Sequence, residues 1–209
     1  MKKLIIPVVA IALLASCNSA PKETAETTEA KPAAEVTGVA YNVDTATSLV
    51  SFVGTKPVGK HTGDFKLTAG TLSVTEGNVS GGSFTIDVNS VVLTDINPYA
   101  AKLREHLLGA DFFDVQKFPT ATFEITGSEP LTNDTTGTHK ISGNLTLKGV
   151  TENISFPAKI SLSESEVTAN ASFGIDRTKW GIVYNNDKSL GDKFIYPVVE
   201  IALNIKAKK

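Results

Sequence analysis

The sequence predicts an all-β protein of about eight mostly antiparallel strands with one short helix. Three observations predict this fold. Apolar and polar residues alternate along most of the chain after Tyr41, segments rich in Gly, Asn and Asp separate the alternating runs, and only one stretch has helical spacing. Alternation with a period of two gives a strand one apolar and one polar face. Because the strands lack a βαβ rhythm, a closed barrel and a sandwich both fit them.

The strands follow from the alternation. Six runs carry it most clearly, and they are 84–92, 121–126, 140–147, 154–162, 167–175 and 195–205. Two further strands are expected near 48–54 and 63–74. In the later of these two, the apolar face changes between Leu67 and Leu72, which predicts a β-bulge at Ala69-Gly70.

One stretch, residues 103–119, interrupts the strand pattern. It begins with apolar residues at helical spacing and ends its helical part at a glycine, in the order Leu103, Leu107, Leu108 and Gly109. Aromatic residues then crowd the connection, at Phe112, Phe113 and Phe118. Two interpretations remain open. The helix and its aromatic exit gate one mouth of a barrel, or they close its end as part of the core.

The inward faces bear on whether the interior is filled or hollow. The large residues on them are Phe84, Phe123, Phe156 and Phe173, and the small residues beside these are Ala121, Gly143, Ala158, Ala169, Ala171 and, if it points inward, Ala202. This mixture fits a packed core that fills a taper, and it also fits a narrow apolar tunnel. The clear strands place no charge on their apolar faces. A tunnel lined in this way suits a hydrocarbon chain, which binds through buried apolar area and shape.

The N-terminal part of the chain has the features of a targeting sequence. Residues 1–16 have the positive start, apolar run and small residues of a secretory signal peptide. Cys17, the only cysteine, follows at the position of the acylated cysteine of a bacterial lipobox, which predicts a lipid anchor to the membrane. Residues 17–39 lack aromatic residues and predict a flexible tether. Residues 40–209 form the domain, which we expect in the bacterial cell envelope, on the periplasmic face or at the outer membrane.

Composition and motifs argue against several classes of function. The net charge is −2 and no basic patch stands out, which argues against a nucleic-acid partner. The histidines His61, His106 and His139 lie far apart and match no metal-ligand spacing. No nucleophile motif or phosphate-binding loop occurs, and the carboxylates lie on the polar faces of the strands. We therefore expect no enzymatic activity, no metal and no cofactor.

Three segments resemble the YceI-like family of bacterial polyisoprenoid-binding proteins. They are 103–119, Gly143–Thr151 and Asp176–Gly181, and they occur in the family's order. The likeness covers roughly Ala40 to Lys206. It implies a lipocalin-like antiparallel barrel that encloses an elongated apolar cavity. It also implies a long-chain isoprenoid, such as a polyisoprenoid or an isoprenoid quinone, as the ligand.

Under this interpretation, the ligand-binding residues lie inside the barrel and at its rim. The tunnel lining is predicted to be Phe84, Ile86, Val88, Phe123, Ile125, Leu145, Leu147, Phe156, Ala158, Ala171 and Phe173. The mouth or gate is predicted to be Leu107, Leu108, Phe112, Phe113, Trp180 and Tyr184. The protein would store, transport or present the isoprenoid lipid.

Two other functions and several properties stay open at this stage. One alternative is a non-catalytic surface interaction scaffold with a packed barrel, and a less favoured one is an enzyme that acts on a bound isoprenoid. The sequence does not fix the head group of the ligand. It also leaves the oligomeric state open, with a homodimer as one alternative.

Overall fold

A computed structural model describes residues 24–96, 98–132 and 134–209, so the predicted signal peptide and Cys17 lie outside the described residues. The elements in chain order are β1 (Glu26–Glu29), β2 (Val39–Val43), β3 (Leu49–Lys56), β4 (Gly59–Thr75), β5 (Asn78–Leu93), α1 (Ala100–Leu108), β6 (Thr120–Pro130), β7 (His139–Leu147), β8 (Val150–Leu162), β9 (Glu166–Asp176), the 3₁₀ turns η1 (Arg177–Trp180) and η2 (Lys188–Lys193), and β10 (Val198–Lys208). The barrel closes within the described residues, because β10 pairs with β3.

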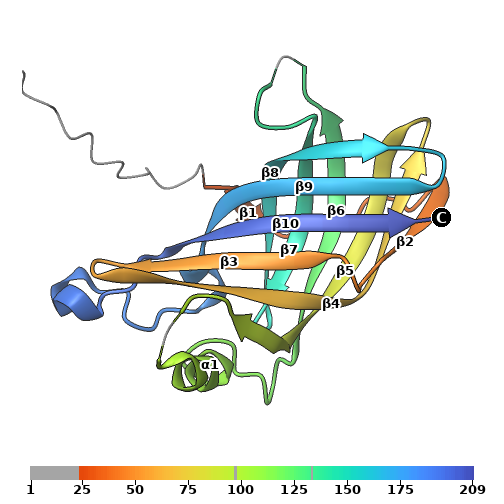
Figure 1. The fold of residues 1–209 in the computed structure, drawn as a ribbon. Coiled ribbons are helices and arrows are strands. Elements are labelled where there is room, and N and C mark those ends of the chain that lie inside the picture. The colour runs from red at the N-terminus through yellow and green to blue at the C-terminus, as the bar shows by residue number, and fades with distance from the viewer. Residues whose placement is uncertain (1–23, 97, 133) are drawn as a thin grey trace, which may run out of the picture.

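The strands β3 to β10 form a closed antiparallel barrel (Figure 1). Each strand pairs with its neighbour in the chain, and β10 closes the barrel by pairing with β3. Strand β2 pairs with the far parts of β4 and β10, so β2 and β3 together act as one interrupted strand. The predicted fold class, an all-β barrel of about eight strands with one short helix, is confirmed.

Local details of the strands and the helix also match the sequence pattern. The register between β4 and β5 shifts between Leu67 and Ala69, which places the predicted bulge at Thr68. The turn from β7 to β8 uses Lys148 and Gly149, both with positive φ (49° and 76°), as a two-residue hairpin with a type I′ turn requires. Helix α1 is followed by Gly109, whose N–H donates to the carbonyl of His106 (3.1 Å).

The two ends of the barrel differ. One end, called the mouth end below, is formed by the β3–β4 and β7–β8 turns, α1, η1 and η2. The opposite end is formed by the β4–β5 and β8–β9 turns. There Tyr41 of β2 is buried, and its hydroxyl donates to the carbonyls of Ser163 (3.3 Å) and Glu164 (3.4 Å) in the β8–β9 turn. Tyr41 therefore ties β2 to the far end of the barrel.

The N-terminal segment corrects one prediction. Residues 17–39 were expected to be a flexible tether, but 24–39 lie along the outside of the barrel. Strand β1 pairs with residues 152–155 of β8, and the N–H of Ala25 donates to the carbonyl of Gly174 on β9 (2.8 Å). The composition of residues 24–39 predicted disorder because the segment has almost no large apolar residues. Hydrogen bonds between its main chain and the edges of barrel strands hold it in place. Amino-acid composition does not reveal such bonds.

Asn144 of β7 is the main side-chain clamp on this segment. Its amide accepts from the N–H of Lys31 (3.0 Å) and donates to the carbonyl of Lys31 (2.6 Å), and it also accepts from the side chain of the buried Asn153 (3.0 Å). The amide therefore satisfies main-chain groups of the segment and an internal side chain at once.

Asn144→Ala should loosen the N-terminal segment without opening the barrel. We expect a loss of about 1–2 kcal/mol in unfolding free energy and faster amide hydrogen exchange in residues 26–34, because the bonds to Lys31 and Asn153 disappear. Asn170→Ala, which changes an exposed asparagine on β9, is the matched control. Unchanged exchange in the segment would mean that the strand pairing alone holds it.

Candidate ligand-binding cavity

The barrel encloses a cavity of about 660 Å³ that residues from all eight strands line. This volume falls in the range of about 300–1,000 Å³ that is typical of small-molecule sites. Away from the mouth, the lining side chains are aliphatic or aromatic, and they include Leu72 and Ile141 toward the far end. The polar lining residues, such as Lys56 and Asn185, lie at the mouth end. The hollow interior argues against the alternative of a packed barrel.

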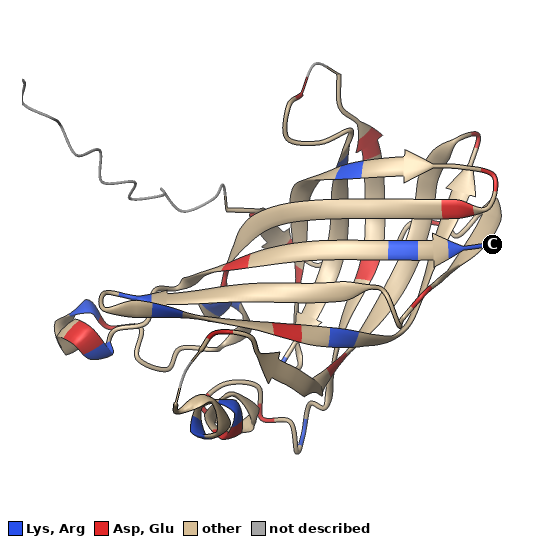
Figure 2. Cartoon of the chain, in the orientation of Figure 1, with Lys and Arg blue, Asp and Glu red and all other residues tan. Residues whose placement is uncertain are grey.

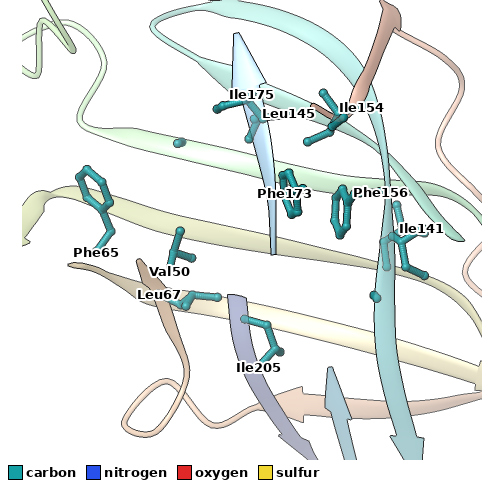
Figure 3. Packing of buried hydrophobic residues seen from close by; sticks show 14 of the residues in the cluster. Val50, Phe65, Leu67, Ile141, Leu145, Ile154, Phe156, Phe173, Ile175 and Ile205 are labelled. Carbon is teal, nitrogen blue, oxygen red and sulfur yellow. The ribbon is translucent and has the colours of Figure 1, made fainter. Parts of the chain in front are cut away.

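An aromatic wall runs along one side of the cavity. The rings of Phe84, Phe123, Phe156 and Phe173 follow one another with centroid distances of 6.3, 5.8 and 3.9 Å, and the last pair is stacked. They come from β5, β6, β8 and β9, while β7 contributes Gly143. A Cβ at Gly143 would lie only 2.2 Å from the Phe123 ring, so the absence of a side chain makes room for that ring. Figure 3 shows Phe156 and Phe173 with parallel faces inside the barrel.

Nine of the eleven residues predicted to line the tunnel do line this cavity. They are Phe84, Phe123, Ile125, Leu145, Leu147, Phe156, Ala158, Ala171 and Phe173. The alternation of the strands located them, because inward and outward positions repeat every two residues. Their role in holding a ligand stays a prediction.

The other two predicted lining residues, Ile86 and Val88, do not line the cavity. Pairing between β5 and β6 ends at Asp87, and beyond it Arg104 of α1 donates to main-chain carbonyls of β5, including that of Val91 (2.9 Å). Val88 is buried in an irregular stretch of β5, residues 88–91, before β5 pairs with β4 again at Val92. Ile86 lies just before this stretch and packs against the core. Alternation gives the face of a regular strand but not the point at which a bulge interrupts it.

The predicted mouth residues divide in a similar way. Leu107, Phe112, Phe113 and Tyr184 line the cavity, whereas Leu108 packs against the core outside it. Trp180, also predicted at the mouth, lies at the mouth end in η1 but does not line the cavity. Its side chain is fully buried, and its indole N–H donates to the carbonyl of Leu145 on β7 (2.9 Å). Trp180 therefore fixes η1 to the barrel wall.

Aromatic contacts join the two loop regions of the mouth. The His106 ring lies 4.7 Å from the ring of Tyr184 and 5.2 Å from that of Phe112, and Phe112 and Tyr184 lie 5.4 Å apart. Phe113 packs edge-on against Phe65 of β4 at 5.6 Å. The exit of α1 thus forms one side of the mouth and touches the connection between η1 and η2. The stretch that the sequence singled out lines the opening and contributes to the core as well.

Arg177 is a mouth residue that the predicted site did not include. Its guanidinium is buried and donates to the carbonyls of Ile182, Tyr184 and Ile195, and more distantly to that of Tyr196. Burial lowers the pKa of this group from its ordinary value, and the charge of Asp176 acts in the opposite direction. Arg177 therefore organises the loop from η1 to β10 while it borders the cavity.

His61 is a second polar residue of the cavity lining at the mouth end. The Nδ1 atom of His61 is 3.0 Å from a carboxylate oxygen of Asp95, and the N–H of Thr62 donates to the other oxygen (3.1 Å). Burial alone would raise the pKa of Asp95, but the bonds from His61 and Thr62 outweigh it and lower the pKa below its ordinary value. The mouth therefore offers polar and charged partners to the head of an amphiphile.

Within 24–96, 98–132 and 134–209, no group of three or more His, Cys, Asp or Glu side chains is placed to hold a metal ion. In the same residues, no helix is long and apolar enough to cross a membrane.

Comparison with known proteins places this barrel among relatives. Protein YceI of Salmonella arizonae is 34% identical over 98 residues, which are 47% of this chain and 48% of that protein. The chain thus matches about half the length of its curated relatives. Protein YceI of Salmonella newport matches to the same extent.

Solved structures share the fold. BcnA of Burkholderia cenocepacia aligns with a TM-score of 0.65 at 23% identity, over 79% of this chain and 99% of that one. A polyisoprenoid binding domain from Saccharophagus degradans aligns with a TM-score of 0.58 at 20% identity, over 80% and 97% of the two chains. The sequence profile described as YceI-like domain matches residues 41–207, nearly the whole barrel. The chain therefore belongs to the YceI-like domain family.

Proposed function

We propose that the protein binds a long-chain isoprenoid, or a similar amphiphilic lipid, inside its barrel. The observation that carries the proposal is the 660 Å³ cavity, whose interior lining is aliphatic and aromatic and whose polar residues lie at one end. The Saccharophagus degradans domain with the same fold is itself described as polyisoprenoid-binding, which supports the same ligand class.

The geometry favours an extended hydrocarbon chain with a small polar head. Burial of apolar surface contributes about 25 cal/mol per Å², so a chain that follows the bore gains affinity along its whole length without hydrogen bonds. The head would remain at the mouth, near Arg177, Asn185 and Lys193. Selection would then rest on chain length and width rather than on the position of individual polar atoms.

The N-terminal sequence supports a proposal for the cellular role. We infer that Cys17 carries a lipid anchor and that the protein works in the bacterial cell envelope, where it stores, transports or presents the bound lipid. The signal-like residues 1–16 and the position of the lone cysteine support this inference.

Mass spectrometry of an organic extract tests the ligand. Residues 18–209, purified from a bacterial host, should yield a prenyl lipid in about one-to-one ratio with protein. If the extract holds no lipid and the purified protein fails to take up added isoprenoid quinone, the proposal is wrong.

A further inference from the structure

The mouth end carries exposed apolar side chains on two neighbouring projections. Val58 lies in the β3–β4 turn and is 60% exposed, while Val183, Leu190 and Tyr196, between η1 and β10, are 53, 40 and 43% exposed. The N–H of Tyr196 donates to the carbonyl of Thr55 (3.0 Å), so the two projections are joined. Figure 1 shows the β3–β4 turn and η2 extending together beyond the barrel. We call residues 53–61 and 176–197 the rim surface.

The rim surface is positively charged within a negatively charged protein. It contains six Lys and Arg residues and three Asp residues, a net charge of +3, whereas the whole chain has a net charge of −2. Lys60, Lys188 and Lys193 are exposed. Two of the three aspartates already serve the fold, because Asp176 caps η1 and Asp187 caps η2. Figure 2 shows basic segments (blue) in η2, together with acidic ones (red), and further basic segments in the two strands beside the β3–β4 turn.

The rim surface also borders the opening of the cavity. Lys56 and Lys193 belong to the cavity lining as well as to this surface. The described chain begins at Thr24, which bridges to Gly174 of β9, three residues before Arg177. The predicted anchor Cys17 precedes Thr24 by seven residues, which span at most about 25 Å when extended. A membrane that holds this anchor therefore lies within reach of the mouth end.

From these observations we propose that the rim surface docks on an anionic phospholipid bilayer and sets the cavity mouth against the lipid. Apolar side chains on projecting turns, with lysines between them, match the layered chemistry of a bilayer interface, where acyl chains lie beneath anionic head groups. An amphiphile would then pass between bilayer and cavity without crossing water. Val58, Lys60 and Lys188 of the rim surface lie outside the cavity lining, so the docking is tested at these positions without a ligand.

A fluorescent label reports the docking directly. Residues 18–209 contain no cysteine, so Val58→Cys gives a single site for an environment-sensitive label. Vesicles of phosphatidylcholine with about one third phosphatidylglycerol should shift its emission to shorter wavelength. Val36→Cys is the control position. Val36 is 69% exposed and lies beside Gly81, near the end of the barrel opposite the mouth, so a label there should not respond. No shift at Val58, or equal shifts at both positions, would overturn the proposal.

The positive charge of the rim surface allows a second, independent test of the docking proposal. The double variant Lys60→Glu and Lys188→Glu, which changes no residue of the cavity lining, should lose about tenfold or more in binding to the same vesicles, as measured by flotation. Uptake of added isoprenoid quinone in solution should persist in this variant. Unchanged vesicle binding would overturn the docking proposal, whereas loss of quinone uptake with intact vesicle binding would count against it and assign the lysines to the ligand site instead.

Discussion

Ala171→Phe should weaken the binding of long isoprenoid chains by nearly two orders of magnitude while the barrel remains folded. Ala171 lines the middle of the cavity, and its partners across the sheet are Ala158 on β8 and Leu203 on β10. A phenyl ring there would displace about one isoprene unit. The loss of about 100 Å² of buried apolar surface at about 25 cal/mol per Å² corresponds to about 2.5 kcal/mol, or nearly a hundredfold in Kd.

Ala202→Phe is the matched control for this substitution. Ala202 is the neighbour of Leu203 on β10, but its side chain is exposed on the outside of the barrel. The control adds the same ring to the same sheet and should bind ligand as the unmodified protein does. Titration with a fluorescent isoprenoid compares the two variants, and circular dichroism checks the fold. Equal affinity in both variants would show that the ligand lies outside the bore.

Arg177→Met should give the largest loss of stability among single substitutions at the mouth. Methionine leaves the carbonyls of Ile182, Tyr184 and Ile195 buried without the donor that now satisfies them. We expect a decrease of about 3–5 kcal/mol in unfolding free energy, since removing one partner of a buried polar network strands the others. Urea unfolding followed by the fluorescence of Trp180, the only tryptophan, measures the change.

Lys179→Met separates this effect from a general loss of positive charge. Lys179 lies two residues away, is exposed and has no role in the carbonyl network. Its replacement should change the unfolding free energy by less than about 0.5 kcal/mol. Similar losses in both variants would mean that charge at the mouth, rather than the bonds of Arg177, stabilises the loop.

The inward faces of the barrel were predictable because a strand repeats every two residues. Ala158, Ala171 and Phe173 were assigned to the interior from alternation alone, and they line the cavity. The same rule misplaced Val88, since it carries no information on where a bulge interrupts a strand. Features that depend on regular strand geometry can therefore be predicted from the sequence, whereas irregularities in the strand pairing cannot.

The remaining differences involve partners that are distant in sequence. Trp180 was expected at the rim, yet its indole bonds to a carbonyl 35 residues earlier in the chain. Residues 24–39 were expected to be flexible, but β8, more than a hundred residues away, supplies the edge on which β1 lies. No local property of an indole or of an Ala- and Thr-rich segment reveals such a partner.

The way the barrel closes has a consequence for how the chain folds. Seven of the eight strand pairings join neighbours in sequence and can form as hairpins soon after both strands exist. The eighth joins β3 to β10, at opposite ends of the domain, and carries a large loop-closure entropy. Because β10 follows all the other barrel strands in the chain, a growing chain holds an open sheet until β10 has been made. Removal of the last strand should therefore leave two unpaired edges and an aggregating protein rather than a smaller barrel.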